Sequence, residues 1–163
     1  MEKFQEVRDK SKKHIQIADH MLSVTYPLVK DPKLLLAVIE NIFLAYTNAI
    51  GCLLYYERLF KRIPPFQENF ESKFHMFKET CVLKYNIDKS YVADIQDIKN
   101  IIIEHKKSPI EFARKDRFVI CSNNYKLETI SVNEIKKHID KAKLFIQEIN
   151  NITNKDEGLF RQG

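Results

Sequence analysis

Residues 34–60 read LLLAVIENIFLAYTNAIGCLLYYERLF, and this stretch decides the fold. Its apolar residues cover most of the circumference of a helix, whereas a helix at a protein surface carries one apolar stripe. The part from Asn41 to Tyr56 has no charged side chain, but it is shorter than the ~20 apolar residues that cross a bilayer. We therefore expect a central, buried helix from Pro32 to about Arg62, surrounded by its neighbours, and no membrane span.

Apolar residues recur at three- or four-residue spacing in four further segments, which predicts a helix in each. These helices are expected over residues 2–28, 70–85, 88–108 and 132–154. Asp31 before Pro32, Asp88, and Ser131 with Glu134 three residues later are typical helix N-caps.

Between these last two helices the helical period is lost. Residues 118–122 and 125–130 predict two short strands joined by a turn at Asn123 and Asn124. The expected fold is all-α: an up-and-down antiparallel bundle of four or five helices with a short β-hairpin before the last helix. We expect one domain over residues 1–154 and a flexible C-terminal tail over residues 155–163.

Composition limits the classes of function. The 163 residues include 44% hydrophobic and 30% charged side chains, with 3 Gly and 5 Pro, which is typical of a globular helical domain. The three cysteines show no CxxC spacing, so we expect neither a zinc site nor disulfides, and the N-terminus carries charge from its second residue rather than a signal-peptide core. These features favour a cytoplasmic protein. A net charge of +5 permits contact with nucleic acid or an acidic partner.

Two pairs of side chains have the spacing of metal ligands on one helix face. Glu71 and His75, and Glu134 and His138, each lie four residues apart. Di-iron bundles use Glu-x-x-His on two helices with further glutamates, which this chain lacks. We therefore interpret both pairs as hydrogen-bonded surface pairs and expect no metal. No phosphate-binding loop or dinucleotide fingerprint is present, so we expect no cofactor.

Polar residues interrupt the apolar helix at Glu40, Asn41, Thr47 and Asn48. A buried polar group must be hydrogen-bonded or lie against a cavity. Hydrogen bonds between helices are the ordinary interpretation, and a small-molecule pocket is the alternative.

Arg8 and His14 form an R-x5-H pattern in the first helix. This pattern and the long antiparallel helix pair resemble the HEPN family of helical bundles, many of which are dimeric metal-independent ribonucleases or nucleotide-associated adaptors. The resemblance implies Arg8 and His14 as candidate catalytic residues. In that family the motif lies late in the bundle, however, and on one helix these two residues lie about 120° apart. We therefore expect a member without nuclease activity, with an endoribonuclease as the less favoured hypothesis.

The segment from Glu104 to Phe118 is the strongest candidate site, because it combines clustered cations with aromatic residues. Lys and Arg neutralise phosphates, and exposed aromatic rings stack on unpaired bases. We expect a loop that binds RNA or a partner, with a solvated connector as the alternative. The candidate binding residues are His105, Lys106, Lys107, Phe112, Arg114, Lys115 and Arg117.

The leading hypothesis is therefore a non-enzymatic binding module that contacts RNA or a ribonucleoprotein through this basic segment. The alternative is a homodimeric protein-interaction or adaptor module. It depends on a narrow apolar seam in the last helix, which suits packing along another long helix. The seam consists of Val132, Ile135, Ile139, Ala142, Ile146 and Ile149.

Overall fold

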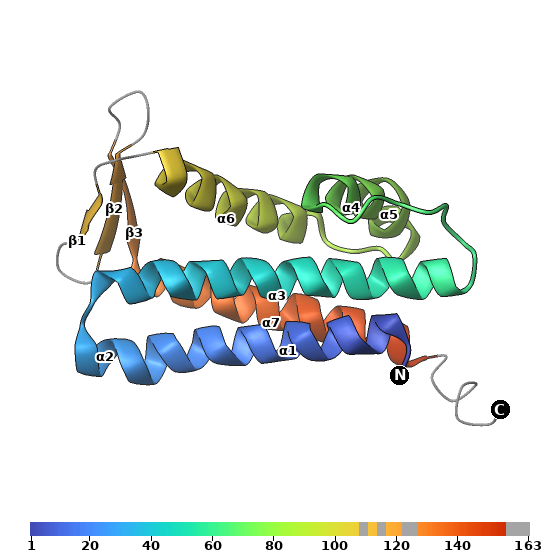
Figure 1. The fold of residues 1–163 in the computed structure, drawn as a ribbon, viewed down its shortest axis with the longest axis horizontal. Coiled ribbons are helices and arrows are strands. Elements are labelled where there is room, and N and C mark those ends of the chain that lie inside the picture. Colours follow the sequence, from blue (N-terminus) through green and yellow to red (C-terminus); the bar gives the residue numbers. More distant parts are fainter. Residues whose placement is uncertain (108–110, 114–116, 122–126, 156–163) are drawn as a thin grey trace.

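The computed structural model describes residues 1–107, 111–113, 117–121 and 127–155, with side chains for residues 1–105 and 130–155. Within these ranges helices predominate, and the fold is an all-α bundle with a small sheet at one end (Figure 1). Its long helices lie side by side along the long axis of the molecule.

The first helix is continuous but changes its winding before its end. It comprises α1 (Lys3–His20), the π-helical segment η1 (Met21–Thr25) and α2 (Tyr26–Val29). Lys30, in the left-handed region with φ 54°, then reverses the chain into α3 (Pro32–Leu59). The side chain of Asp31 accepts a hydrogen bond from the amide of Lys33 at 3.0 Å, which confirms the predicted N-cap.

The α3 helix packs against α1, α7, α4 and α6, and supplies much of the core. It is not surrounded on every side, however. Glu40 is exposed and Leu44 is 42% exposed, so one face of α3 meets solvent, contrary to the expectation from its composition. The α3 helix is long and apolar enough to cross a membrane, but buried core helices of soluble proteins often meet the same two criteria. The length argument against a membrane span is therefore wrong, and the absence of a membrane stays a prediction.

The shorter helices lie on α3 in two antiparallel segments. The first comprises α4 (Phe70–Met76), the π-helical segment η2 (Phe77–Cys81) and α5 (Val82–Lys84). The second is α6 (Lys89–Lys107), whose first turn is capped by Asp88, since its carboxylate accepts a hydrogen bond from the amide of Ser90 at 2.8 Å. An ion pair between Glu71 and Lys99 joins the beginning of α4 to the middle of α6.

Three short strands pair antiparallel in the order β1-β2-β3. They are β1 (Glu111–Ala113), β2 (Arg117–Cys121) and β3 (Leu127–Ser131), with Val119 opposite both Phe112 and Thr129. Strand β1 was not expected, because three residues carry too little alternation to reveal a strand. The predicted turn at Asn123 and Asn124 lies outside the described residues, so the hairpin connection stays a prediction.

The last helix, α7 (Val132–Asn154), closes the core. The hydroxyl of Ser131 accepts a hydrogen bond from the amide of Glu134 at 3.1 Å, as expected for its N-cap. The ring of Phe145 contacts those of Tyr46 on α3, Phe77 on η2 and Tyr91 on α6, with centroids 5.2–5.8 Å apart. Phe145 therefore ties three segments of the bundle to α7.

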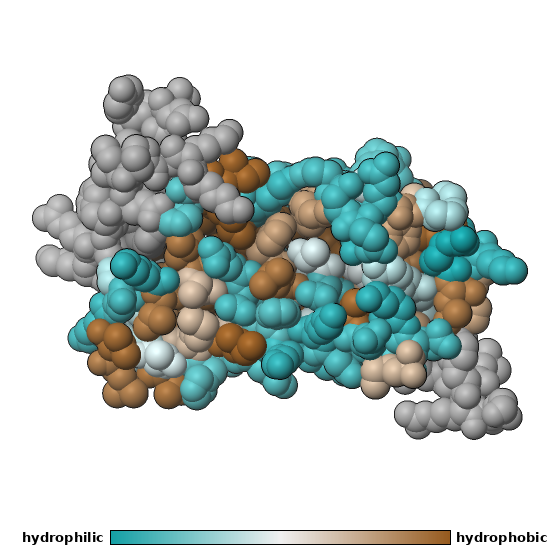
Figure 2. Space-filling model, in the orientation of Figure 1, coloured by the Kyte–Doolittle hydropathy of each residue, from teal (hydrophilic) through white to brown (hydrophobic). Residues whose placement is uncertain are grey.

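The apolar seam of α7 is used inside the chain. From Ile135 to Ile149 its members are 0–7% exposed. This seam therefore offers no free strip for a second subunit, which removes the reason given for a homodimer, and the homodimer itself stays a prediction. Figure 2 shows that one described face of the bundle is mostly hydrophilic, with apolar side chains gathered over α2, where Leu28 is 82% exposed.

Candidate functional site

The basic segment predicted from the sequence is not a single loop. His105, Lys106 and Lys107 belong to the last turns of α6, whereas Phe112 lies in β1 and Arg117 begins β2. The expectation of a loop is wrong for these residues: His105, Lys106 and Lys107 end the helix that was expected over residues 88–108, and Phe112 and Arg117 lie in strands. Arg114 and Lys115 lie outside the described residues, as do the side chains of the others except His105. A role in binding RNA stays a prediction for all of them.

Arg8 and His14 are held by different helices. The Arg8 guanidinium donates to the side chains of Asn154 at 3.0 Å and Thr153 at 3.4 Å, at the end of α7. His14 Nδ1 lies 3.1 Å from the side-chain oxygen of Asn41 on α3. Their separation along α1 thus carries them to different neighbours, and within one chain they do not form a common site.

Neither predicted Glu–His pair forms a metal site. The partner of Glu71 is Lys99, and His75 is exposed. His138 bonds Asp94 across the interface with α6, with its Nδ1 2.6 Å from the carboxylate, rather than Glu134 one turn away. The predicted pairing within the helix is wrong here because a buried carboxylate requires donors more than an exposed one does. In the described ranges no group of three or more His, Cys, Asp or Glu residues could hold a metal ion.

Asp94 is the centre of a buried network that joins three helices. It is 8% exposed and accepts a hydrogen bond from the Tyr46 hydroxyl at 2.5 Å, in addition to the one from His138. Burial, followed by the charge of Asp94 and this bond, raises the pKa of Tyr46 far above its ordinary value, so its hydroxyl remains a donor. Asp94 gives no signal of its own in the sequence, because it falls among exposed polar residues of α6.

The polar residues predicted to be buried in α3 line neither of the two pockets described below. Asn41, Thr47 and Asn48 donate to the carbonyl groups of residues one turn earlier on the same helix, at 2.8–2.9 Å. The buried acid is instead Glu57, which is 1% exposed.

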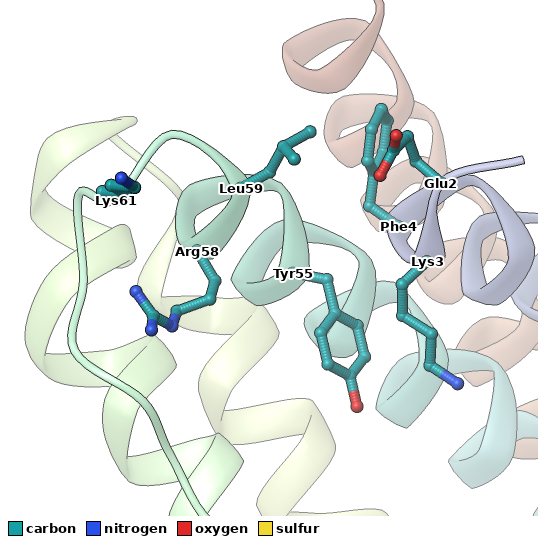
Figure 3. Close-up of a pocket in the computed structure, with 7 residues that line it drawn as sticks. All are labelled: Glu2, Lys3, Phe4, Tyr55, Arg58, Leu59 and Lys61. Atoms are coloured by element: carbon teal, nitrogen blue, oxygen red, sulfur yellow. The ribbon is translucent and has the colours of Figure 1, made fainter.

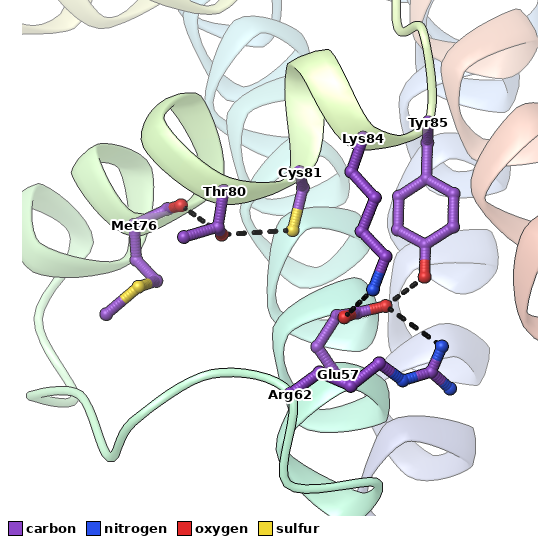
Figure 4. A network of polar contacts seen from close by, with 7 residues as sticks. All are labelled: Glu57, Arg62, Met76, Thr80, Cys81, Lys84 and Tyr85. Carbon is purple, nitrogen blue, oxygen red and sulfur yellow. Dashed lines mark hydrogen bonds and ion pairs between the residues drawn. The ribbon is translucent and has the colours of Figure 1, made fainter.

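Glu57 is surrounded by cationic and hydroxyl donors (Figure 4). Its carboxylate accepts hydrogen bonds from Lys84 Nζ at 2.7 Å and from the Tyr85 hydroxyl, and Arg62 lies 3.9 Å away. Burial, followed by the hydrogen bond to Glu57, raises the pKa of Tyr85, which keeps this donor protonated. The network ties the end of α3 to α5 and is a structural element of the fold.

A pocket of about 380 Å³ lies where α1 begins and α3 ends (Figure 3). We call it the terminal pocket. Its apolar side is made by Phe4, Tyr55 and Leu59, and its charged residues are Glu2, Lys3, Arg58 and Lys61.

Three cations of the terminal pocket form no ion pair with a described side chain. Among the described side chains, no carboxylate lies within 4.0 Å of Lys3, Arg58 or Lys61. A buried cation would require such a partner, but these three ammonium and guanidinium groups are hydrated and available to an external anion.

Tyr55 shapes one wall of the terminal pocket. The ammonium groups of Lys3 and Lys73 lie 5.7 and 5.4 Å from the centre of its ring, and its hydroxyl bonds Glu68 at 2.5 Å. Hydrogen bonds from Tyr55 and Lys73 lower the pKa of Glu68. Lys3 and Lys73 therefore both lie against the ring, and the carboxylate of Glu68, which forms an ion pair with Lys73 at 3.0 Å, also attracts Lys3 without forming an ion pair with it.

We found no match to this chain among family models, curated proteins or solved structures. The resemblance to HEPN bundles therefore remains an expectation from the sequence.

Proposed function

We propose that this protein is a non-enzymatic RNA-binding module that holds the phosphodiester backbone at the terminal pocket. The observation that supports this proposal is the gathering of three exposed cations around one pocket, none of them in an ion pair with a described side chain: Lys3, Arg58 and Lys61. Cations of this kind release counterions from nucleic acid when they neutralise phosphates, and this release supplies most of the affinity of sequence-independent binding. The net charge of +5 acts in the same direction.

The arrangement of the cations favours a polyanion over a small phosphate ligand. Lys3 and Arg58 lie on either side of Tyr55, and Lys61 lies on the turn that follows α3 (Figure 3). A single phosphate would need donors that converge on one point, whereas cations spread along an arc suit successive phosphates of one strand. Because lysines already flank Tyr55, we expect contact with the backbone rather than base stacking, and hence little sequence preference.

The beginning of α1 and the end of α3, which line the terminal pocket, lie at the opposite end of the bundle from the last turn of α6 and from strands β1 and β2 (Figure 1). The 28 residues of α3 span about 42 Å between them. If the basic segment also binds RNA, the two contacts are separate, and their variants will weaken binding independently.

The test is the salt dependence of RNA binding. Fluorescence anisotropy with a labelled oligouridine of about 20 nucleotides measures Kd between 50 and 200 mM salt. Three neutralised phosphates predict a slope of about −2 in log affinity against log salt, or about a 20-fold loss across this range. The triple variant Lys3→Gln, Arg58→Gln, Lys61→Gln should abolish the contribution of the pocket. A matched variant, Lys13→Gln, Lys33→Gln, Lys137→Gln, removes the same charge from exposed positions on three helices.

Binding at the terminal pocket is supported if the triple variant of the pocket reduces both the affinity for RNA and the slope of log affinity against log salt, while the matched variant changes neither by more than a small fraction. Equal losses in the two variants would mean that net charge alone attracts RNA, and would refute the pocket. A loss confined to a variant of Lys106, Lys107, Arg114, Lys115 and Arg117 would place binding at the basic segment instead. Gel electrophoresis of the recovered RNA should show intact strands, because cleavage would contradict a non-enzymatic role.

A further inference from the structure

A second, apolar groove lies between the antiparallel segments α4–α5 and α6. Its volume is about 490 Å³. One wall is formed by Phe74, Lys78 and Val82, each four residues after the last, and the other by residues of α6 at the spacing of one helix face. These α6 residues are Lys89, Val92, Ala93 and Gln96.

The floor of this groove is continuous with the core. Phe74 is 2% exposed and stacks on Phe70, which in turn contacts Phe43 of α3, with ring centroids 5.1 and 4.9 Å apart. The rim residues, by contrast, reach water: Val82 and Val92 are half-buried and Ala93 is exposed. A ligand in the groove would thus complete a packed layer on a rigid base.

The shape of the groove selects a helix. Its walls are two rows of helical side chains, and a third helix packs into such a channel at about 8–10 Å from each neighbour. The α6 row runs from Lys89 to Gln96, a rise of seven steps of 1.5 Å or about 10.5 Å, which is the length of two helical turns. Two turns present three apolar anchors, at positions i, i+3 or i+4, and i+7. The wall also contains the π-helical segment η2, and such segments are frequent at functional sites.

The charge around the groove selects an acidic partner. At one end Lys99 is neutralised by Glu71. Lys78 in the middle of one wall and Lys89 at the other end have no carboxylate within 4.0 Å among the described side chains, although Glu79 and Asp88 are their neighbours in sequence. Lys78 Nζ lies 4.6 Å from the centre of the Phe74 ring, a contact worth only about 0.5–1 kcal/mol at an exposed site. It can therefore turn towards an acidic side chain at small cost.

We propose that this groove binds an amphipathic, acidic helix of another protein, about two turns long. Three apolar side chains of that helix fill the space above Phe74, Val92 and Ala93, and its carboxylates pair with Lys78 and Lys89. The inference does not depend on RNA binding, because the groove shares no residue with the terminal pocket.

The experiment uses a display library of random 16-residue peptides, selected on the whole protein. Counter-selection uses Ala93→Arg, which fills the groove at an exposed position and keeps a good helix former there. The Gln16→Arg variant adds the same charge at an exposed site on α1 and serves as the matched control. Thermal unfolding followed by circular dichroism establishes that both variants fold.

We expect the selected peptides to be acidic, with apolar residues at helical spacing. The best synthetic peptide should bind at least tenfold more weakly to Ala93→Arg and to the double variant Lys78→Glu, Lys89→Glu. Its affinity should be unchanged for Gln16→Arg and for the triple variant of the terminal pocket, Lys3→Gln, Arg58→Gln, Lys61→Gln. The proposal would be overturned if the enriched peptides are basic or proline-rich. It would also be overturned if every enriched peptide binds Ala93→Arg as well as it binds the unchanged protein. It would also be overturned if sedimentation shows a dimer that Ala93→Arg converts to a monomer, since a second copy then occupies the groove.

Discussion

Replacement of Glu57 by glutamine is expected to destabilise the protein by about 2–3 kcal/mol. The carboxylate is 1% exposed and accepts two direct hydrogen bonds, from Lys84 and Tyr85. Bonds to a charged group contribute about 1.5–3 kcal/mol each. Glutamine keeps one acceptor oxygen and turns an amide donor towards the other partner, so one of these bonds is lost. The Coulombic loss adds little, because the side chains of Lys84 and Arg62 are 40% and 34% exposed and can turn to water.

The control lies on the same helix. Glu40 is exposed, so Glu40→Gln removes the same charge from α3 and should change stability by less than about 0.5 kcal/mol. Urea unfolding followed by circular dichroism gives both free energies of unfolding. The Lys84→Met variant should cost about 1–2 kcal/mol, since Glu57 keeps its bond from Tyr85. The double variant should cost at least about 1 kcal/mol less than the two single changes together, because both remove one interaction.

Ionic strength separates this network from a surface ion pair. A buried interaction is screened little, so the difference between Glu57→Gln and Glu40→Gln should persist in about 0.5 M salt. If the two variants have equal stability, with the same dependence on urea, water reaches the Glu57 carboxylate and our account of the network is wrong.

Two further predictions concern α3. Gly51→Ala should stabilise the protein by about 0.5–1 kcal/mol, as measured by urea unfolding. The reason is that Gly51 has no positive φ and that the added Cβ would meet Tyr55 at an ordinary van der Waals distance of 3.7 Å. Destabilisation would show that the helix cannot accept a methyl group there. Burial and the charge of Asp94 raise the pKa of Tyr46, so the stability that this gives is present below about pH 10 and is lost as the pH rises above it. Between about pH 10 and 11 the free energy of unfolding of the Tyr46→Phe variant should therefore fall less steeply than that of the unchanged protein, by up to about 1.4 kcal/mol per pH unit. If the two plots of unfolding free energy against pH are parallel, the raised pKa of Tyr46 is contradicted.

Most helices of the fold could be predicted, because the apolar spacing and the capping residues that define them lie close together in the sequence. The side chains of Asp31 and Ser131 each cap a helix as their positions before it predict. The π-helical segments η1 and η2 were not found, because one extra residue per turn changes the phase of a pattern too little to be read in five residues.

The position of each residue around α3 was not enough to predict which of its acidic side chains is buried. Glu57 follows Ile50, Leu53 and Leu54 at seven, four and three residues, which places it on a buried face, whereas Glu40 precedes the exposed Leu44 by four. This signal is present in the sequence. It is unreadable in a helix that is apolar on nearly all sides, because no polar face marks which direction meets solvent.

The terminal pocket gives no signal for a different reason: its cations do not form a run of charge along the chain. Lys3 is separated by more than fifty residues from Arg58 and Lys61, so no window of sequence contains all three. The two helical segments, residues 3–29 and 32–59, are nearly equal in length and joined by a tight turn. Such a pair must bring the first residues of one segment to the last residues of the other. The grouping of these cations thus follows from the helix lengths and the position of the turn, both of which the sequence supplies, and a search for charge clusters in helical proteins should begin from that pairing.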